Sequence, residues 1–140
     1  MLDTNVLSAL IPEEPDSSVV AWLNGTDDAE IWITAVTVFE IQLGLSLMHP
    51  GRRRRFLEAA FDGVLNDDFR GRILPFDEAS ALEAGVLSAR RRKQGFTDDL
   101  RDIQIAGIAR VHGAIVATRN VRHFVDLGPV LINPWSTGVD

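Results

Sequence analysis

The sequence predicts an α/β fold, a three-layer α/β/α domain with a mostly parallel central sheet of about four to five strands. Short apolar runs alternate with longer stretches of helical character along the whole chain. The connections between successive apolar runs are long enough for the helical crossovers that parallel strands require. Apolar residues make up 46% and charged residues 24% of the 140 residues, the mixture of a soluble globular protein. We therefore expect residues 1–140 to form a single domain.

The expected strands are short apolar runs that end at a polar residue or a turn signal. In chain order they are residues 1–2, 31–33, 73–76, 114–117 and 130–132. The first is a minimal strand that ends at Asp3. The third contains Pro75, which has no backbone N–H, so we expect this strand at the sheet edge or the proline at the strand end.

Most of the expected helices lie between a residue that can cap the N-terminus and a Gly or Pro that ends the helix. In chain order the helices are residues 5–10, 19–23, 34–48, 52–65, 77–95 and 103–112, the last opened by residues 98–102. The expected caps of the second, third and fifth helices are Ser17 or Ser18, Thr34 and Asp77. Helical spacing predicts that two sets of side chains face inward: Val36, Phe39, Leu43 and Leu47 in the third helix, and Phe56, Ala60 and Phe61 in the fourth.

Composition narrows the classes of protein. The absence of cysteine excludes disulfides, thiolate metal sites and cysteine nucleophiles, and it fits a reducing compartment. No apolar run has the length of a membrane span and no signal-like segment opens the chain, so we expect a cytoplasmic protein that does not enter membranes. The formal charge of −6 argues against a general nucleic-acid binder.

The charge is unevenly distributed. Residues 1–51 contain eight acidic residues and no Lys or Arg, whereas residues 52–140 contain all 14 bases and 12 acids. Eight of the bases lie in two runs, Arg52–Arg55 and Arg90–Lys93. Such a run is usually a solvated helix face, and it can also flank a substrate pocket or meet an acidic partner.

Four polar residues map to the carboxyl ends of the expected strands, where open parallel sheets bind ligands. They are Asp3, Glu40, Asp102 and Asn120. Carboxylates gathered at one edge repel each other unless a cation lies between them, and oxygen ligands suit Mg²⁺ or Mn²⁺. The three histidines show no zinc spacing.

Each of these residues also has a purely structural interpretation. Asp3 can cap the first helix, and Asp102 can cap the helix that follows it. Glu40 has capping-box spacing from Thr37, although it lies inside an apolar helical run. Asn120 can be an ordinary turn residue.

Several segments at these residues resemble one family. They are Leu2-Asp3-Thr4-Asn5, residues 34–40 with Leu43-Gly44, Asp102 with Ile105-Ala106, and Ala117-Thr118-Arg119-Asn120. Together they resemble the PIN domain, with the VapC-type ribonuclease toxins as the best fit. Residues 71–77 and 132–135 resemble the FitB-like branch in particular. The resemblance covers residues 1–135.

The resemblance implies an endoribonuclease that depends on one or two Mg²⁺ or Mn²⁺ ions held by Asp3, Glu40 and Asp102. The fourth ligand position, often Asp in the family, is Asn120 here, which adds no charge and predicts a weaker second metal. Another departure is His123, which stands where many relatives have Asp. Relatives also usually carry one or two more apolar residues before the first Asp, so we expect a short first strand.

The family further implies a homodimer that a VapB-like antitoxin inhibits, in a higher hetero-oligomer that reaches operator DNA only through the antitoxin. We expect the hydroxyls of Thr4 and Thr118 to orient water or a carboxylate. Arg119 and Arg122 are candidates for gripping RNA phosphates, with solvated loop arginines as the alternative. The rival function is a catalytically weak PIN-like binding module that acts with an antitoxin on operator DNA.

Overall fold

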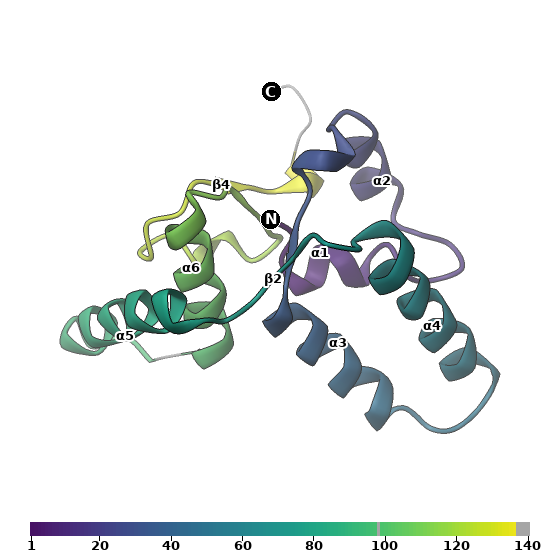
Figure 1. Ribbon diagram of the computed structural model, residues 1–140, viewed down its shortest axis with the longest axis horizontal. Coiled ribbons are helices and arrows are strands. Elements are labelled where there is room, and N and C mark those ends of the chain that lie inside the picture. The colour runs from purple at the N-terminus through teal and green to yellow at the C-terminus, as the bar shows by residue number, and fades with distance from the viewer. Residues whose placement is uncertain (98, 137–140) are drawn as a thin grey trace.

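Helices make up most of the computed structural model, which describes residues 1–97 and 99–136 (Figure 1). Within this part of the chain the α-helices are α1 (Thr4–Ser8), α2 (Ser17–Asn24), α3 (Ala35–Leu47), α4 (Arg52–Gly63), α5 (Glu78–Lys93) and α6 (Leu100–His112). The strands are β1 (Ile33–Thr34), β2 (Ile73–Leu74), β3 (Val116–Ala117) and β4 (Leu131–Ile132). The shorter helical turns are η1 (Asp28–Glu30), η2 (Val64–Asp68), η3 (Val121–His123) and η4 (Pro134–Ser136).

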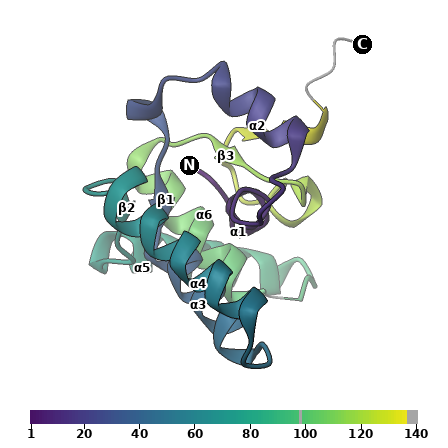
Figure 2. The ribbon, with the colours of Figure 1, turned by 90° about the vertical axis from the view of Figure 1, so that its right-hand side faces the viewer.

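The strands form two parallel pairs that the N-terminal segment joins. β1 pairs with β2 and β3 pairs with β4, both in parallel. Leu2 N–H donates to Trp32 O at 2.8 Å on one side, and Asp3 N–H donates to Ala117 O at 2.9 Å on the other. Residues 1–3 therefore lie between β1 and β3, as Figure 2 shows. The expected parallel sheet, its short first strand and the edge position of β2 are confirmed.

Side chains alternate between the two faces of this sheet and build a core on each. Leu2, Ile33 and Ala117 pack in one cluster with residues of α1, α2, α3 and α4. Their neighbours Met1 and Val116 pack in the other cluster with residues of α5 and α6. In Figure 1 these two groups of helices lie on opposite sides of the strands. The predicted three-layer arrangement is therefore confirmed.

Gly107 brings α5 and α6 close together. A Cβ atom at this position would lie 2.6 Å from Ser80 O and 2.9 Å from the Ala84 Cβ, distances that no real contact adopts. The close approach seats α6, and with it Asp102, firmly against the core.

Two helix starts differ from the prediction. The cap of α2 is Asp16, whose Oδ1 accepts the N–H groups of Ser18 and Val19, so the assignment to Ser17 or Ser18 is wrong. The last long helix begins at Leu100, and Asp99 caps it. Asp98, part of the expected opening, lies outside the described residues. Thr34 and Asp77 cap α3 and α5 as predicted.

Of the expected inner face of α3, Val36 is buried as predicted, but the rest of the assignment is wrong. Phe39 is 56% and Leu47 is 77% exposed, and the other buried residues of α3 are Thr37, Ile41 and Leu45. In α4, Phe61 is buried as predicted, but Phe56 is 44% exposed. Both helices carry apolar residues on more than one side, so their spacing does not define which side meets the core. In the described part of the chain, no helix is long and apolar enough to cross a membrane.

Candidate active site

Asp3 lies at the end of the central N-terminal segment and is only 4% exposed. Its Oδ2 accepts a hydrogen bond from Thr118 Oγ1 at 2.7 Å and another from Asn5 Nδ2 at 3.2 Å. Its Oδ1 accepts the Thr4 N–H at 2.8 Å, so Asp3 also caps α1. The structural and the functional interpretations of Asp3 are thus compatible, because one carboxylate serves the cap and faces the site.

Glu40 reaches the same region from the second turn of α3. Thr4 Oγ1 donates to its Oε1 at 2.8 Å, which links Glu40 to the residue beside Asp3. The N-cap of α3 is Thr34, whose Oγ1 accepts the Thr37 N–H, so Glu40 takes no part in a capping box. Arg101 Nη1 lies 3.5 Å from Glu40 Oε2, and the Arg101 guanidinium stands over the Phe39 ring.

Asp102 enters from the first turn of α6. Asp99, not Asp102, is the helix cap, and its Oδ1 accepts the Asp102 N–H. The Asp102 carboxylate instead contacts His123, with 3.0 Å between Asp102 Oδ2 and His123 Nδ1. The structure therefore assigns His123 a contact that the sequence alone leaves open.

The three carboxylates carry more negative charge than their surroundings offset. Burial raises the pKa of Asp3 above its ordinary value, and the charge of Glu40 adds to the rise. Burial, followed by the charges of Asp99 and Asp3, raises the pKa of Asp102 to about 6, although His123 acts in the opposite direction. Glu40 acts on Asp3 and Asp3 acts on Asp102, so Asp3 links the three carboxylates into one electrostatic unit.

Of the remaining predicted residues, Thr4 and Thr118 contact the carboxylates, whereas Asn120 and Arg119 have other partners. Thr4 and Thr118 each donate a hydroxyl hydrogen bond to a carboxylate of the unit. Asn120 is exposed, and its backbone N–H donates to Thr118 Oγ1. Among the described residues, no hydrogen bond joins the Asn120 side chain to the three carboxylates. Arg119 stacks on the Trp135 ring with its guanidinium carbon 4.8 Å from the ring centroid.

A buried arginine holds the loop that carries His123. The Arg91 side chain is 8% exposed and binds both carboxylate oxygens of Asp126, at 3.0 and 2.7 Å. Its Nη2 also donates to His123 O at 2.7 Å. Arg91 thereby connects α5 to both ends of the segment 123–126. Neither Arg91 nor Asp126 carries a signal in the sequence that separates it from its charged neighbours.

Two hollows border members of the carboxylate unit. One of about 300 Å³ lies beside Asp102 and His123 and is also lined by Arg122. Another of about 270 Å³ is lined by Thr4, Glu40 and Arg53, among others. Asp102 and Glu40 are therefore each reached from an adjoining hollow.

The donor set suits a hard cation, because it consists of carboxylate oxygens. In the conformation of the described residues, however, no three His, Asp or Glu side chains stand close enough to coordinate one ion together. Glu40 faces Arg101 and Asp102 faces His123, and both partners are partly exposed side chains that can turn away.

The raised pKa of Asp102 predicts that ionisation of this carboxyl lowers the stability of the folded chain. The Asp102 carboxyl binds its proton more tightly in the folded chain than in the unfolded chain. The protonated carboxyl therefore contributes its full stabilisation of the fold below about pH 4, and this contribution is lost as the pH rises through about 6. In EDTA near pH 7.5, we expect Asp102→Asn to raise Tm by roughly 3–6 °C, since it removes on the order of 1–2 kcal/mol of repulsion and desolvation.

Thermal melts at several pH values test this expectation. The gain should disappear near pH 4, where wild-type Asp102 is protonated. Asp62→Asn, which removes an exposed carboxylate from α4, serves as the charge-matched control. An equal gain at both pH values would contradict the assignment of the effect to Asp102 ionisation.

Comparison with known proteins agrees with this geometry. Residues 1–128 match the PIN domain family. The chain is 36% identical to the VapC ribonuclease Y4jK of Sinorhizobium fredii over 135 residues, 96% of both chains. It is 33% identical to toxin FitB of Neisseria gonorrhoeae over 96% of this chain and 97% of that one.

A solved structure of FitAB bound to the IR36 DNA fragment superposes with a TM-score of 0.88 at 33% identity. The match covers 99% of this chain and 96% of the FitAB chain. Fold and sequence lead to the same assignment: the chain belongs to the PIN domain family, with VapC ribonucleases and FitB toxins among its relatives.

Proposed function

We propose that this protein is a metal-dependent endoribonuclease toxin of a toxin–antitoxin pair. The observation that carries the proposal is the convergence of Asp3, Glu40 and Asp102, from three separate elements, in one incompletely neutralised unit beside open hollows. The names of its relatives, a VapC ribonuclease and a FitB toxin, support the same activity. The negative charge of buried Asp3 and half-buried Glu40 and Asp102 is otherwise a cost to the fold.

Asp3, Glu40 and Asp102 would hold one Mg²⁺ or Mn²⁺ ion, and Asn120 would complete the ligand set or contribute to a weaker second site. A bound ion of this kind supplies a water of lowered pKa and neutralises charge on the phosphate. Thr4 and Thr118 fix the directions of Glu40 and Asp3 through their hydroxyls. Arg101 and His123 offset Glu40 and Asp102 and would turn toward the substrate when the carboxylates bind a cation.

Arg122 lines the hollow beside Asp102, where its guanidinium can contact an RNA phosphate. The contribution of Arg119 to such a grip is weaker in this proposal, because Trp135 already occupies its guanidinium face. These roles place the phosphodiester between the carboxylates and the loop that follows β3.

We assign the protein two protein partners. A VapB-like antitoxin would block the carboxylates and connect the complex to operator DNA, as the DNA-bound FitAB structure suggests. A second copy of the chain would cover the exposed apolar face of α3, where Phe39, Leu43 and Gln42 line a shallow hollow. A ribonuclease with these partners would act in the cytoplasm.

Incubation of the purified protein with total cellular RNA tests the proposed activity. We expect discrete cleavage products with Mg²⁺ or Mn²⁺ and none with EDTA, with cut sites that sequencing of the RNA ends can map. Restored cleavage after the metal is returned in excess would show that EDTA left the fold intact. Antitoxin binding without cleavage under any metal condition would instead support the catalytically weak binding module.

A further inference from the structure

We propose that single-stranded RNA flanking the cleaved phosphodiester lies in a groove between α4 and the connection of α1 to α2. We call it the α4 groove, and it is lined by Pro12, Glu13, Arg52, Arg53, Phe56 and Leu57. Arg52 and Arg53 contact phosphates there, and Phe56 stacks on a base. This inference rests on the proposed ribonuclease function and extends it to a substrate-binding surface.

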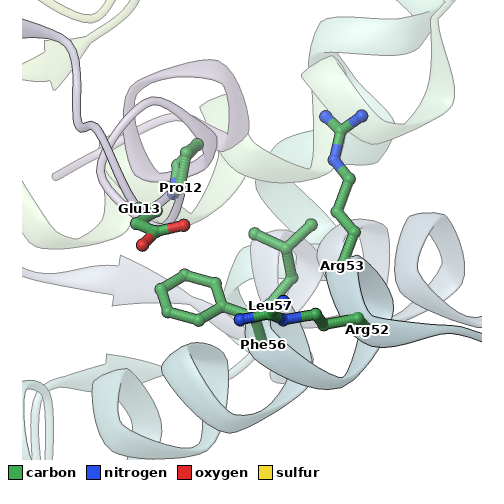
Figure 3. A pocket seen from close by; sticks show the side chains of 6 residues that line it. All are labelled: Pro12, Glu13, Arg52, Arg53, Phe56 and Leu57. Carbon is green, nitrogen blue, oxygen red and sulfur yellow. The ribbon is translucent and has the colours of Figure 1, made fainter.

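The α4 groove continues into the candidate active site. It has a volume of about 490 Å³, and Figure 3 shows its six side chains. Pro12, Arg53 and Leu57 also line the neighbouring hollow that reaches Thr4 and Glu40. An RNA strand that places a phosphate at the carboxylates must leave along the protein surface, and this shared wall gives it a continuous path.

The two arginines of the groove are available for phosphates. Other arginines of the described residues are engaged within the fold: Arg54 with Glu58, Arg91 with Asp126 and Arg110 with Glu83. No ion pair within the described part of the chain involves Arg52 or Arg53, and both are exposed. Planar guanidinium groups bind phosphate oxygens through paired hydrogen bonds, so these side chains suit a nucleic-acid backbone.

Phe56 adds an exposed aromatic face to the same wall. It follows Arg52 and Arg53 by four and three positions, so the three side chains share one side of α4. Its side chain is large and apolar, yet it is 44% exposed. Alternating cations and aromatic faces are the usual composition of surfaces that bind single-stranded nucleic acid without strict sequence preference.

Glu13 lies on the opposite wall, across from Phe56 in Figure 3. It repels a phosphate backbone but attracts a basic peptide. Removal of the Glu13 charge should therefore strengthen the binding of RNA and weaken the binding of a positively charged protein segment. Arg52 and Arg53 outnumber it among the residues that line the groove, which favours RNA.

Fluorescence anisotropy with a short fluorescein-labelled single-stranded RNA tests the groove in the full chain, with EDTA present to prevent cleavage. We expect Arg52→Gln and Arg53→Gln each to weaken binding roughly three- to fivefold and to reduce the salt slope of log K by about 0.7. Phe56→Ala should weaken binding about tenfold with little change in that slope, and Phe56→Leu should not restore it. Glu13→Gln should tighten binding.

Arg55→Gln is the matched control, because Arg55 is exposed on the same helix but does not line the groove. It should change affinity by less than about twofold. Thermal melts of all variants show whether each remains folded, which exposed positions of α4 should allow. Losses for Arg52, Arg53 and Phe56 no larger than that of Arg55 would overturn the proposal. Weaker binding by Glu13→Gln would also overturn it and indicate a basic occupant.

The groove and the proposed activity can fail separately. Wild-type protein that binds RNA through Arg52, Arg53 and Phe56 yet never cleaves it would retain the groove and reject the ribonuclease. Protein that cleaves RNA with the same KM after these three substitutions would retain the ribonuclease and reject the groove.

Discussion

Replacing Asp3 by Asn is expected to reduce RNA cleavage at least roughly a thousandfold, because we propose Asp3 as a metal ligand and the loss of such a ligand removes several kcal/mol of transition-state stabilisation. Asp3 is the most buried of the three carboxylates, the charge of Glu40 raises its pKa, and its own charge raises the pKa of Asp102. Single-turnover cleavage of a mapped RNA site in saturating Mn²⁺ measures the loss. The folded state should survive, since the Asn side chain can still accept the Thr4 N–H.

Asp77→Asn provides the matched control for this change. Asp77 also caps a helix by accepting a backbone N–H, that of Ser80, but it lies away from the carboxylate unit. Its variant should retain full cleavage. Full activity of purified Asp3→Asn, free of contaminating nuclease, would remove Asp3 from the catalytic assignment. If thermal melts show that Asp3→Asn loses cleavage because it unfolds, Asp102→Asn serves as the second test. We expect Asp102→Asn to be folded and stable but inactive.

Replacing Arg91 by Met is expected to destabilise the protein by about 3 kcal/mol, or roughly 10 °C in Tm. The substitution keeps the length of the buried stem but removes the hydrogen bonds to Asp126 and to His123 O. The Arg91 guanidinium lowers the pKa of Asp126, so the wild-type pair should also weaken as falling pH protonates that carboxyl. Chemical and thermal unfolding at neutral pH measure the difference.

Arg90→Met tests whether position or charge causes the effect. Arg90 precedes Arg91 in the same helix and is exposed, so its loss should change stability by less than about 0.5 kcal/mol. Since Arg91 secures the loop that carries His123, Arg91→Met should also reduce cleavage more than Arg90→Met does. Equal stability of the two variants would show that the buried ion pair contributes nothing net.

The alternation of strands and helices was predictable because it depends on local patterns. Caps such as Thr34 and Asp77 follow from residue chemistry next to an apolar run. The buried side of α3 was not predictable, because Thr37 is buried through its contacts with Thr34 and Thr4 while Phe39 points outward. Those contacts depend on tertiary packing, which the spacing of apolar residues along the sequence does not reveal. That residues 1–140 form one domain stays a prediction.

The acidic residues of the candidate site could be proposed from the sequence, because Asp3 follows an expected strand, Asp102 opens a helix and Glu40 interrupts an apolar helical run. Their partners could not. Arg101 meets Glu40 across 61 positions, and His123 meets Asp102 across 21. Such pairs are set by how α3, α6 and the loop after β3 approach one another. Asn5, which contacts Asp3 and accepts the Arg119 N–H, was signalled only as part of the Asp3-Thr4-Asn5 segment.

The placement of residues 1–3 in the middle of the sheet has a consequence for biosynthesis. A ribosome synthesises Asp3 before Thr118, and the Thr118 hydroxyl that orients Asp3 arrives 115 residues later. The same delay applies to Ala117, whose backbone pairs with Met1 and Asp3. Contacts of such high sequence separation form late and slowly. The carboxylate unit therefore stays incomplete until Thr118 has been synthesised, and before that point the ribosome carries a chain whose site is not yet assembled.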